Sequence, residues 1–210
     1  MIVIKFGGHA MDENAHQWMA EIAIRFKAGE KFVIVHGGGP QIDAELNVRG
    51  IEKKSVNGFR ITTPEVMHVV EMVLTGTVLR SVVRSLIGVG LPAVGITGSD
   101  SRLLEVALKD KEKLGLVGVV NKVNPKIIHD LLDMGYLPVV SPVANDATGQ
   151  ALNVNADIAA GAIAGALRAT QTLFMTDVSG IYSRWPDQSS MIDEITVAQL
   201  KELTFADGMV

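Results

Sequence analysis

The sequence contains no cysteine. This absence excludes a disulfide scaffold, a thiolate nucleophile and any zinc or iron–sulfur centre with cysteine ligands. A chain without disulfides is compatible with a reducing compartment. We therefore expect a cytoplasmic protein.

Aromatic residues and excess positive charge are also scarce. The chain has two Trp, two Tyr and six Phe, and its 19 Lys+Arg against 23 Asp+Glu leave a net charge of −4. Nucleic-acid binding usually needs a basic surface and aromatic side chains on which bases stack. We therefore expect no nucleic-acid partner.

Long hydrophobic runs are missing from the sequence as well. Only four apolar residues precede Lys5, which is too few for a signal peptide. No later apolar run reaches the length of a membrane span. The sequence therefore predicts a soluble protein without a membrane partner.

What remains is the pattern of a globular α/β protein of 210 residues, 48% of them hydrophobic. Short β-branched runs alternate with stretches of helical periodicity, which predicts a mainly parallel sheet covered by helices on both faces. We expect one domain with an open sheet in a three-layer αβα sandwich. The expected strands are 1–6, 31–35, 92–97, 136–141 and 172–176, and the expected helices are 64–87, 125–134, 156–167, 196–203 and one capped by Asp12 and ended by Gly29.

Two stretches interrupt this alternation. Residues 52–62 surround Asn57-Gly58, and residues 103–121 surround a charged turn at 109–113. Turn residues between short β-rich pieces indicate hairpins. We expect these hairpins to lie over the rim of the sheet, at its substrate edge.

Two glycine loops follow the first two predicted strands, Gly7-Gly8 and Gly37-Gly38-Gly39-Pro40. The carboxyl ends of parallel strands share one edge, where ligands bind, so the loops should be neighbours. Glycine lets backbone N–H groups approach an anion at a helix start, and Pro40 suits the first helical turn. The alternative for a single such loop is a tight turn without a ligand.

Charged residues accompany these loops. Lys5 ends an apolar strand, where an ammonium group needs either an anion or a route to solvent. Arg60 follows the Asn57-Gly58 turn and can hold a carboxylate or phosphate, although most such arginines are simply solvated. Asp157 begins an alanine-rich helix that Asn155 can cap, and it can reach a strand-end lysine.

Several familiar signatures are absent. The sequence has no Walker loop, no GxGxxG after the first strand, no HExxH helix and no GxSxG elbow. Its five histidines are scattered without ligand spacing. We therefore assign no protein side chain to a metal.

Five motifs occur in an order that resembles the amino acid kinase family from residue 1 to residue 210. The set is more specific than any one of its members. The motifs are Lys5-Phe-Gly7-Gly8, His36-Gly37-Gly38-Gly39-Pro40, Asn57-Gly58-Phe59-Arg60-Ile61-Thr62, Asn153-Val-Asn155-Ala-Asp157 and Thr176-Asp177-Val178-Ser179-Gly180.

The resemblance implies phosphoryl transfer from ATP, with Mg²⁺, to the side-chain carboxylate of N-acetyl-L-glutamate, in arginine biosynthesis. The implied product is an acyl phosphate. A carboxylate is already ionised at pH 7, so such a reaction needs no general base. It would depend on positioning and on charge neutralisation.

The resemblance also implies a role for each matched residue. Lys5 would stabilise the transition state, and Asp157 would orient Lys5. Substrate binding would fall to Gly38, Gly39, Arg60 and Asn153, and nucleotide binding to Gly7, Gly8, Gly37, Asp177 and Gly180.

Two departures from the family pattern carry further expectations. Family members continue beyond Asp207-Gly208-Met209-Val210 with a second phosphate-contacting lysine, so we expect the carboxyl-terminal part to be missing and the 210 residues to turn over poorly. Residues 1–150 would then form the substrate lobe, and 151–210 would begin the nucleotide lobe. Arginine-inhibited relatives carry an extra amino-terminal helix, so the resemblance implies a homodimer that is insensitive to arginine.

Two other functions remain open at this point. One is a sister kinase that acts on another carboxylate, such as an aminoadipate derivative, or on carbamate. The other is a non-catalytic fragment of the same fold that binds a nucleotide or metabolite.

Overall fold

The computed structural model describes residues 1–7, 15–176 and 178–203. Four features singled out in the sequence lie outside the described residues. They are the Asp12 cap, Gly8, Asp177 and the terminal segment 207–210.

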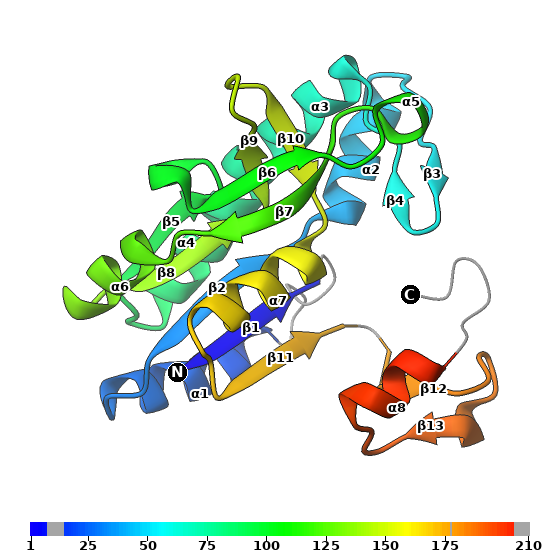
Figure 1. Cartoon of the computed structure of the whole chain (residues 1–210). Helices are drawn as coiled ribbons and strands as arrows, with labels where there is room; N and C mark the ends of the chain where they lie inside the picture. Colours follow the sequence, from blue (N-terminus) through cyan, green and yellow to red (C-terminus); the bar gives the residue numbers. More distant parts are fainter. Residues whose placement is uncertain (8–14, 177, 204–210) are drawn as a thin grey trace.

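A five-stranded sheet in the order β11-β1-β2-β8-β5 forms the centre of the molecule (Figure 1). All four pairings are parallel, so every strand ends at the same edge. This confirms the predicted mainly parallel central sheet. The strands are β1 (Ile2–Phe6), β2 (Phe32–His36), β5 (Ala93–Thr97), β8 (Leu137–Ser141) and β11 (Gln171–Met175).

Helices cover both faces of this sheet. Strand β1 alternates its side chains between two cores, with Ile2 and Ile4 in one and Val3 in the other. A parallel sheet buried on both faces produces such strands, in which neighbouring residues are apolar and buried. The first core takes helices α1 (Ala15–Lys27), α2 (Gly39–Val48), α3 (Pro64–Glu71) and α4 (Leu79–Gly88), and the second takes α6 (Lys126–Asp133) and α7 (Ala156–Ala166).

A π-helical segment, η1 (Met72–Val78), joins α3 and α4 into one helix over residues 64–88. Thr63 caps its start by accepting a hydrogen bond from the Val66 amide at 3.2 Å. This is the one described helix that is long and apolar enough to cross a membrane, so the expectation that no run reaches that length was wrong. More than half of its apolar window is buried inside the fold, as in the core helix of a soluble protein.

A second, four-stranded sheet in the order β6-β7-β10-β9 lies beside the first, which the sequence did not predict (Figure 1). Strands β6 (Leu104–Leu108) and β7 (Val117–Val123) form the expected antiparallel pair, with helix α5 (Lys111–Leu114) at the charged turn. Strands β9 (Val143–Asn145) and β10 (Ala151–Val154) extend this pair into a sheet. Three or four residues are too few to show strand alternation in a sequence.

The other predicted hairpin is confirmed over residues 55–60. Strands β3 (Ser55–Val56) and β4 (Phe59–Arg60) pair across Asn57 and Gly58, both of which have positive φ. Two positive φ angles are what a two-residue hairpin turn requires.

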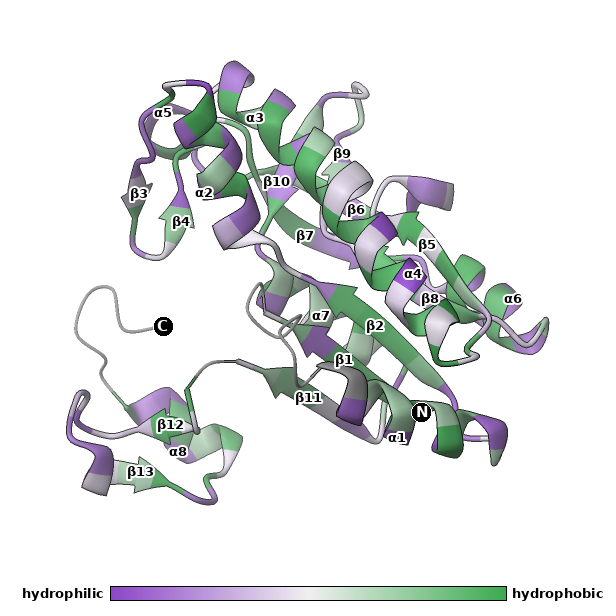
Figure 2. Ribbon diagram, turned by 180° about the vertical axis from the view of Figure 1, so that it is seen from behind, coloured by the Kyte–Doolittle hydropathy of each residue, from purple (hydrophilic) through white to green (hydrophobic). Residues whose placement is uncertain are grey.

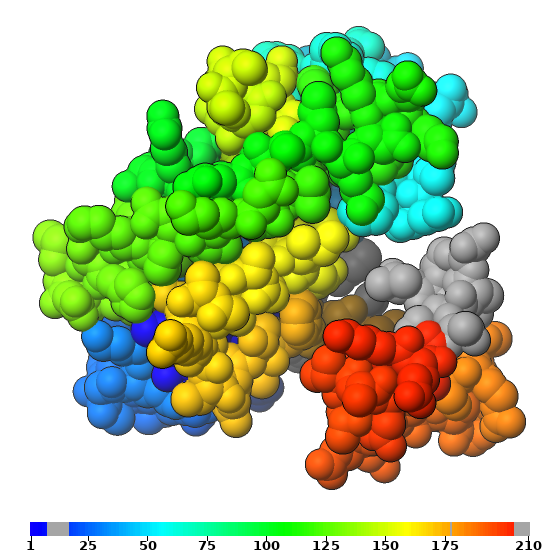
Figure 3. All heavy atoms as spheres, viewed as in Figure 1, coloured from blue at the N-terminus to red at the C-terminus, as the bar shows by residue number. Residues whose placement is uncertain are grey.

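The last described segment forms a small unit that stands apart from the main body (Figures 1 and 3). Strands β12 (Ile181–Tyr182) and β13 (Met191–Ile192) pair, and helix α8 (Val197–Glu202) follows. Thr196 and Gln199 form a capping box at its start, which confirms the surface helix expected at 196–203.

The hydropathy colouring shows that apolar residues concentrate in the central strands of the main body (Figure 2).

Thr62 joins the β3–β4 hairpin to the second sheet. Its N–H donates to the Leu114 carbonyl at 2.8 Å, and its own carbonyl accepts from the Leu116 N–H at 2.7 Å. Gly115 lies between these two partners with φ +70°, and a Cβ there would collide with the Thr62 carbonyl oxygen. The junction therefore requires glycine at position 115.

We expect Gly115→Ala to lower the free energy of unfolding by about 1–3 kcal/mol, because it adds both backbone strain and a clash. Urea denaturation measures this change. Gly88→Ala is the matched control, since Gly88 has open space around its Cβ position and no positive φ. Equal stability of the two variants would contradict the role of Gly115.

Candidate active site

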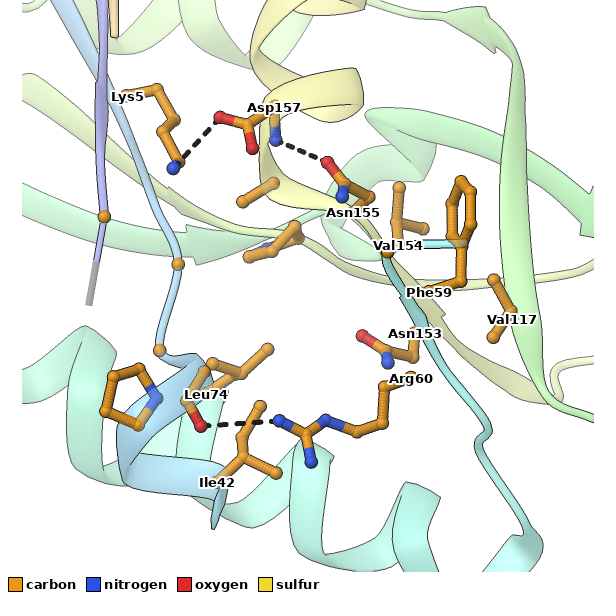
Figure 4. A pocket seen from close by; sticks show the side chains of 18 of the residues that line it. Lys5, Ile42, Phe59, Arg60, Leu74, Val117, Asn153, Val154, Asn155 and Asp157 are labelled. Atoms are coloured by element: carbon orange, nitrogen blue, oxygen red, sulfur yellow. Dashed lines mark hydrogen bonds and ion pairs between the residues drawn. The ribbon is translucent and has the colours of Figure 1, made fainter. Parts of the chain in front are cut away.

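A cavity of about 350 Å³ opens at the carboxyl edge of the central sheet. It lies where β1, the β2–α2 loop, the β3–β4 hairpin, η1 and the start of α7 meet (Figure 4). The structure brings together most of the residues predicted for the site. Those that line the cavity are Lys5, Gly7, Gly37, Gly38, Gly39, Arg60, Asn153 and Asp157.

Lys5 and Asp157 form an ion pair at one side of the cavity. The Lys5 Nζ lies 2.9 Å from the Asp157 Oδ1. The lysine side chain is 12% exposed and the aspartate 54%, so the carboxylate is accessible while the ammonium is set into the wall. A nearly buried ammonium group needs such a partner.

Asn155 places Asp157 on the first turn of α7. The Asn155 Oδ1 accepts the Asp157 N–H at 2.8 Å and the Ile158 N–H at 3.1 Å (Figure 4). This confirms Asn155 as the helix cap and explains how a carboxylate at the helix start reaches Lys5.

Glycines of both loops line the cavity. The Gly37 N–H donates to the Phe6 carbonyl at 2.7 Å, and the Gly7 N–H donates to the Met175 carbonyl at 2.9 Å. The first intrahelical bond of α2 runs from the Ile42 N–H to the Gly38 carbonyl at 2.9 Å. The amides of Gly38 and Gly39 precede that bond, so they are available to an anion.

Gly38 also packs closely against the π-helical segment. A Cβ on Gly38 would lie 2.6 Å from the Leu74 Cδ2 and 3.2 Å from the Val78 Cγ2. Leu74 lines the cavity as well. The π-helical turn therefore supports the glycine loop from below, in keeping with the frequent occurrence of such turns at functional sites.

Arg60 lies on the other side of the cavity from Lys5 (Figure 4). Its Nη2 is 2.5 Å from the Asp43 Oδ1 and 3.4 Å from the Gly39 carbonyl oxygen. Its side chain is 12% exposed, and its Nη1 is buried without a hydrogen-bond partner. The guanidinium is therefore fixed on one edge and has an unmet donor on the other.

Asp43 was missed by the sequence reasoning, because nothing in the α2 sequence distinguishes it from a solvated helix residue. Its Oδ2 lies 2.6 Å from the Lys53 Nζ. Burial raises the pKa of Asp43, but the hydrogen bonds from Lys53 and Arg60 outweigh that effect and leave the pKa below its usual value. Asp43 is thus ionised at neutral pH and holds Arg60.

Thr62 was part of a quoted motif but was given no role, and the structure shows that it links Asn153 to Arg60. The Asn153 Nδ2 donates to the Thr62 Oγ1 at 3.1 Å, and that hydroxyl donates to the Arg60 carbonyl at 2.8 Å. Two residues 93 positions apart are thereby held on the same wall.

Gly180 does not line the cavity. It precedes β12, in the unit that stands apart from the main body. Among the lining residues Asp157 is the one acidic side chain. In the described part of the chain, no three His, Cys, Asp or Glu residues lie close enough together to hold a metal ion.

His36 is buried behind the glycine loop and is 1% exposed. Burial lowers its pKa from 6.5 to about 4; the hydrogen bond with the Gly37 carbonyl opposes the shift, and nearby Arg80 adds to it. The ring is therefore neutral at physiological pH.

Comparison with known proteins gives one family. The amino acid kinase family model matches residues 1–210. A curated acetylglutamate kinase of Arthrobacter sp. (strain FB24) is 46% identical over 96% of this chain and 70% of its own length. The crystal structure of smu.665 from Streptococcus mutans UA159 superposes with a TM-score of 0.82 at 30% identity, over 86% of this chain and 74% of that one. A Giardia carbamate kinase shares the fold alone, with a TM-score of 0.65 at 18% identity over 96% of this chain and 80% of that one.

His36 should make stability depend on pH. Its pKa is lower in the folded state than in the unfolded chain, so its full contribution is present above about pH 6.5 and is lost as pH falls toward 4. Relative to His36→Asn, the wild type should lose about 2 kcal/mol of unfolding free energy between pH 7.5 and 5. Urea denaturation at both pH values measures the difference, with His129→Asn on the exposed face of α6 as the control. A parallel pH dependence of wild type and His36→Asn would contradict this assignment.

Proposed function

The chain belongs to the amino acid kinase family, and we propose that its cavity aligns ATP with the side-chain carboxylate of acetylglutamate. Its activity is the ATP-dependent phosphorylation of acetylglutamate, a step of arginine biosynthesis. The observation that carries the site assignment is a single cavity lined by two cationic side chains whose ion-pair partners differ. Lys5 is paired with an accessible carboxylate on one side, and Arg60 has an unmet donor on the other.

The chemistry requires little acid–base work from the protein. An oxygen of the substrate carboxylate attacks the γ-phosphorus of ATP as the bond from that phosphorus to the β,γ-bridging oxygen breaks. The products are an acyl phosphate and ADP. The attacking carboxylate is already ionised at neutral pH, so the protein needs to position the reactants and stabilise negative charge.

Lys5 is the residue we assign to charge stabilisation. Its position in a wall of low dielectric strengthens its interaction with a developing anion. The ion pair with Asp157 restricts the ammonium to one orientation before substrates bind. We therefore assign Asp157 to orienting Lys5. Asp157 lines the cavity next to Lys5.

Arg60 and Asn153 are assigned to the amino-acid substrate. The Arg60 guanidinium lines the cavity, in support of its binding a substrate carboxylate, and the link through Thr62 keeps Asn153 on the same wall. Gly38 and Gly39 line the same cavity as the two cations, and we assign their amides to the contact with substrate and γ-phosphate.

The nucleotide assignments rest on the resemblance and on the position of the loops. Gly7 and Gly37 line the cavity near Lys5, in support of contact with the ATP phosphates. Gly8 and Asp177, which lie outside the described residues, and Gly180, which does not line this cavity, are proposed for nucleotide binding on the resemblance alone. We further propose that residues 1–150 form the substrate lobe and that 151–210 begin the nucleotide lobe.

Mg²⁺ is proposed as the ion that accompanies ATP. A single acidic side chain lines the cavity, and this donor set fits an ion held mainly by phosphate oxygens and water, as Mg²⁺ prefers. When bound, Mg²⁺ would neutralise charge on the phosphates. We also propose a cytoplasmic homodimer without nucleic-acid or membrane partners.

We expect ADP release to be fastest with N-acetyl-L-glutamate when the protein is given ATP, Mg²⁺ and a panel of acceptors. Hydroxylamine should trap the product as a hydroxamate, because an acyl phosphate is an activated acyl donor. The panel includes N-acetyl-L-2-aminoadipate and carbamate, the substrates of the rival kinases. A higher kcat/KM with either rival would reassign the substrate, and nucleotide binding without ADP release would indicate a non-catalytic protein.

Replacing Lys5 and replacing Arg60 should change different steady-state kinetic parameters. Lys5→Ala should lower kcat by about a hundredfold or more with a small change in KM, because it removes a contact to the transition state. Arg60→Ala should chiefly raise KM for acetylglutamate, because it removes a contact made equally in the ground state. Lys31→Ala is the control, since Lys31 pairs with Asp133 on the surface. The reverse pattern would overturn the two roles.

A further inference from the structure

His36 is the buried titratable residue that the proposed mechanism leaves without a task. It ends β2, where Phe32 and Ile34 point into the core beneath α3 and α4, and strand alternation puts His36 on the same face. It does not line the cavity. Burying an imidazole instead of an apolar side chain costs free energy unless its polar atoms are used.

Only one edge of the ring is used. The Nδ1 lies 2.8 Å from the Gly37 carbonyl oxygen, which can only accept, so Nδ1 carries the proton. The Nε2 is buried and has no hydrogen-bond partner among the described residues. The useful part of His36 is therefore a single N–H donor directed at the next peptide.

That donor completes the anchoring of Gly37. The Gly37 N–H already donates to Phe6 at 2.7 Å, so both polar groups of Gly37 have fixed partners. In a trans peptide the carbonyl of one residue and the N–H of the next point in opposite directions. A Gly37 carbonyl turned toward His36 therefore turns the Gly38 N–H away from the core, to the side where Lys5 and Asp157 lie.

We propose that His36 is a positioning residue, whose Nδ1–H holds the Gly37 carbonyl and thereby aims the Gly38 amide at the phosphoryl group being transferred. This inference rests on the proposed function of the glycine loop. Three consecutive glycines have more accessible conformations than any other tripeptide, so an unanchored loop would have to be ordered at each turnover. A donor fixed in advance avoids that cost.

The surroundings of His36 keep its ring in one protonation state. Burial disfavours a charged His36 ring, and the positive charge of Arg80, at the start of α4, disfavours it further. The neutral ring with its proton on Nδ1 is therefore the working form throughout the neutral pH range.

Substitution by asparagine or by glutamine can distinguish the role of the His36 Nδ1 from that of the Nε2. In His36→Asn the side-chain nitrogen takes the position of Nδ1, whereas in His36→Gln it takes that of Nε2. His36→Leu fills similar space with no donor. Thermal denaturation of each variant monitors folding, so that kinetics are compared between folded proteins.

We expect His36→Asn to keep a kcat at least tenfold above those of His36→Gln and His36→Leu, with KM for acetylglutamate similar in all three. A purely structural histidine would instead rank the variants by thermal stability and lower the active fraction alone. Loss of kcat in folded His36→Asn equal to that in His36→Gln, or full kcat in His36→Leu, would overturn the proposal.

A second measurement does not depend on turnover. In ¹⁵N NMR of the wild type, we expect His36 to show a protonated Nδ1 and an unprotonated Nε2, the minor tautomer of free histidine. The Gly38 amide signal should shift on addition of ADP in wild type and His36→Asn and shift less in His36→Gln. An Nε2-protonated ring would overturn the inference even in an active enzyme, whereas the expected spectra in a protein without kinase activity would place the failure in the proposed function.

Discussion

The parallel pairing of β1 with β2 is the constraint on which the site depends. The register sets Lys5 beside Val35 and Phe6 beside His36, so both strands end on the same rung. The loops that follow them therefore leave the sheet side by side, and Gly37 hydrogen-bonds directly to Phe6. A slip of one residue would turn Lys5 from the cavity into a core and would move the glycine loops out of step.

The site contains two nearly buried cations, and each is neutralised by a different carboxylate. Lys5 and Arg60 are each set into the cavity wall, where an unpaired cation would be costly. Lys5 is paired with a carboxylate that remains accessible, whereas Arg60 is paired with an Asp43 that is itself neutralised by Lys53. The first arrangement restrains the cation beside the anion that we propose it stabilises, and the second leaves an N–H of Arg60 without a partner. Positive charge is thus held at two separated points that an acidic substrate and a nucleotide can bridge.

Much of this arrangement could be predicted from the sequence. The β-branched runs before the glycine loops are local signals, and they placed Lys5 and Gly38 at one edge. Asp157 was placed there by a different signal, the start of the alanine-rich helix that Asn155 caps. The second sheet could not be predicted, because β9 and β10 are shorter than any period that reveals a strand. The roles of Asp43 and Thr62 escaped for another reason: both depend on contacts with residues that are distant in the sequence, and local patterns do not reveal such contacts.

The glycine loop shows how a flexible sequence becomes a rigid site. Three glycines in a row permit backbone to approach a ligand, but on their own they would leave the loop disordered. Here the freedom is removed one contact at a time by neighbours on separate elements. Phe6 on β1 takes the Gly37 N–H, His36 on β2 takes its carbonyl, and Leu74 on the π-helical turn occupies the space a Gly38 side chain would need. Since none of these contacts uses the amides of Gly38 and Gly39, the fold orders the loop while those two amides stay available to the anion that we propose they bind. The same division explains why a buried histidine without catalytic chemistry can still bear on the reaction.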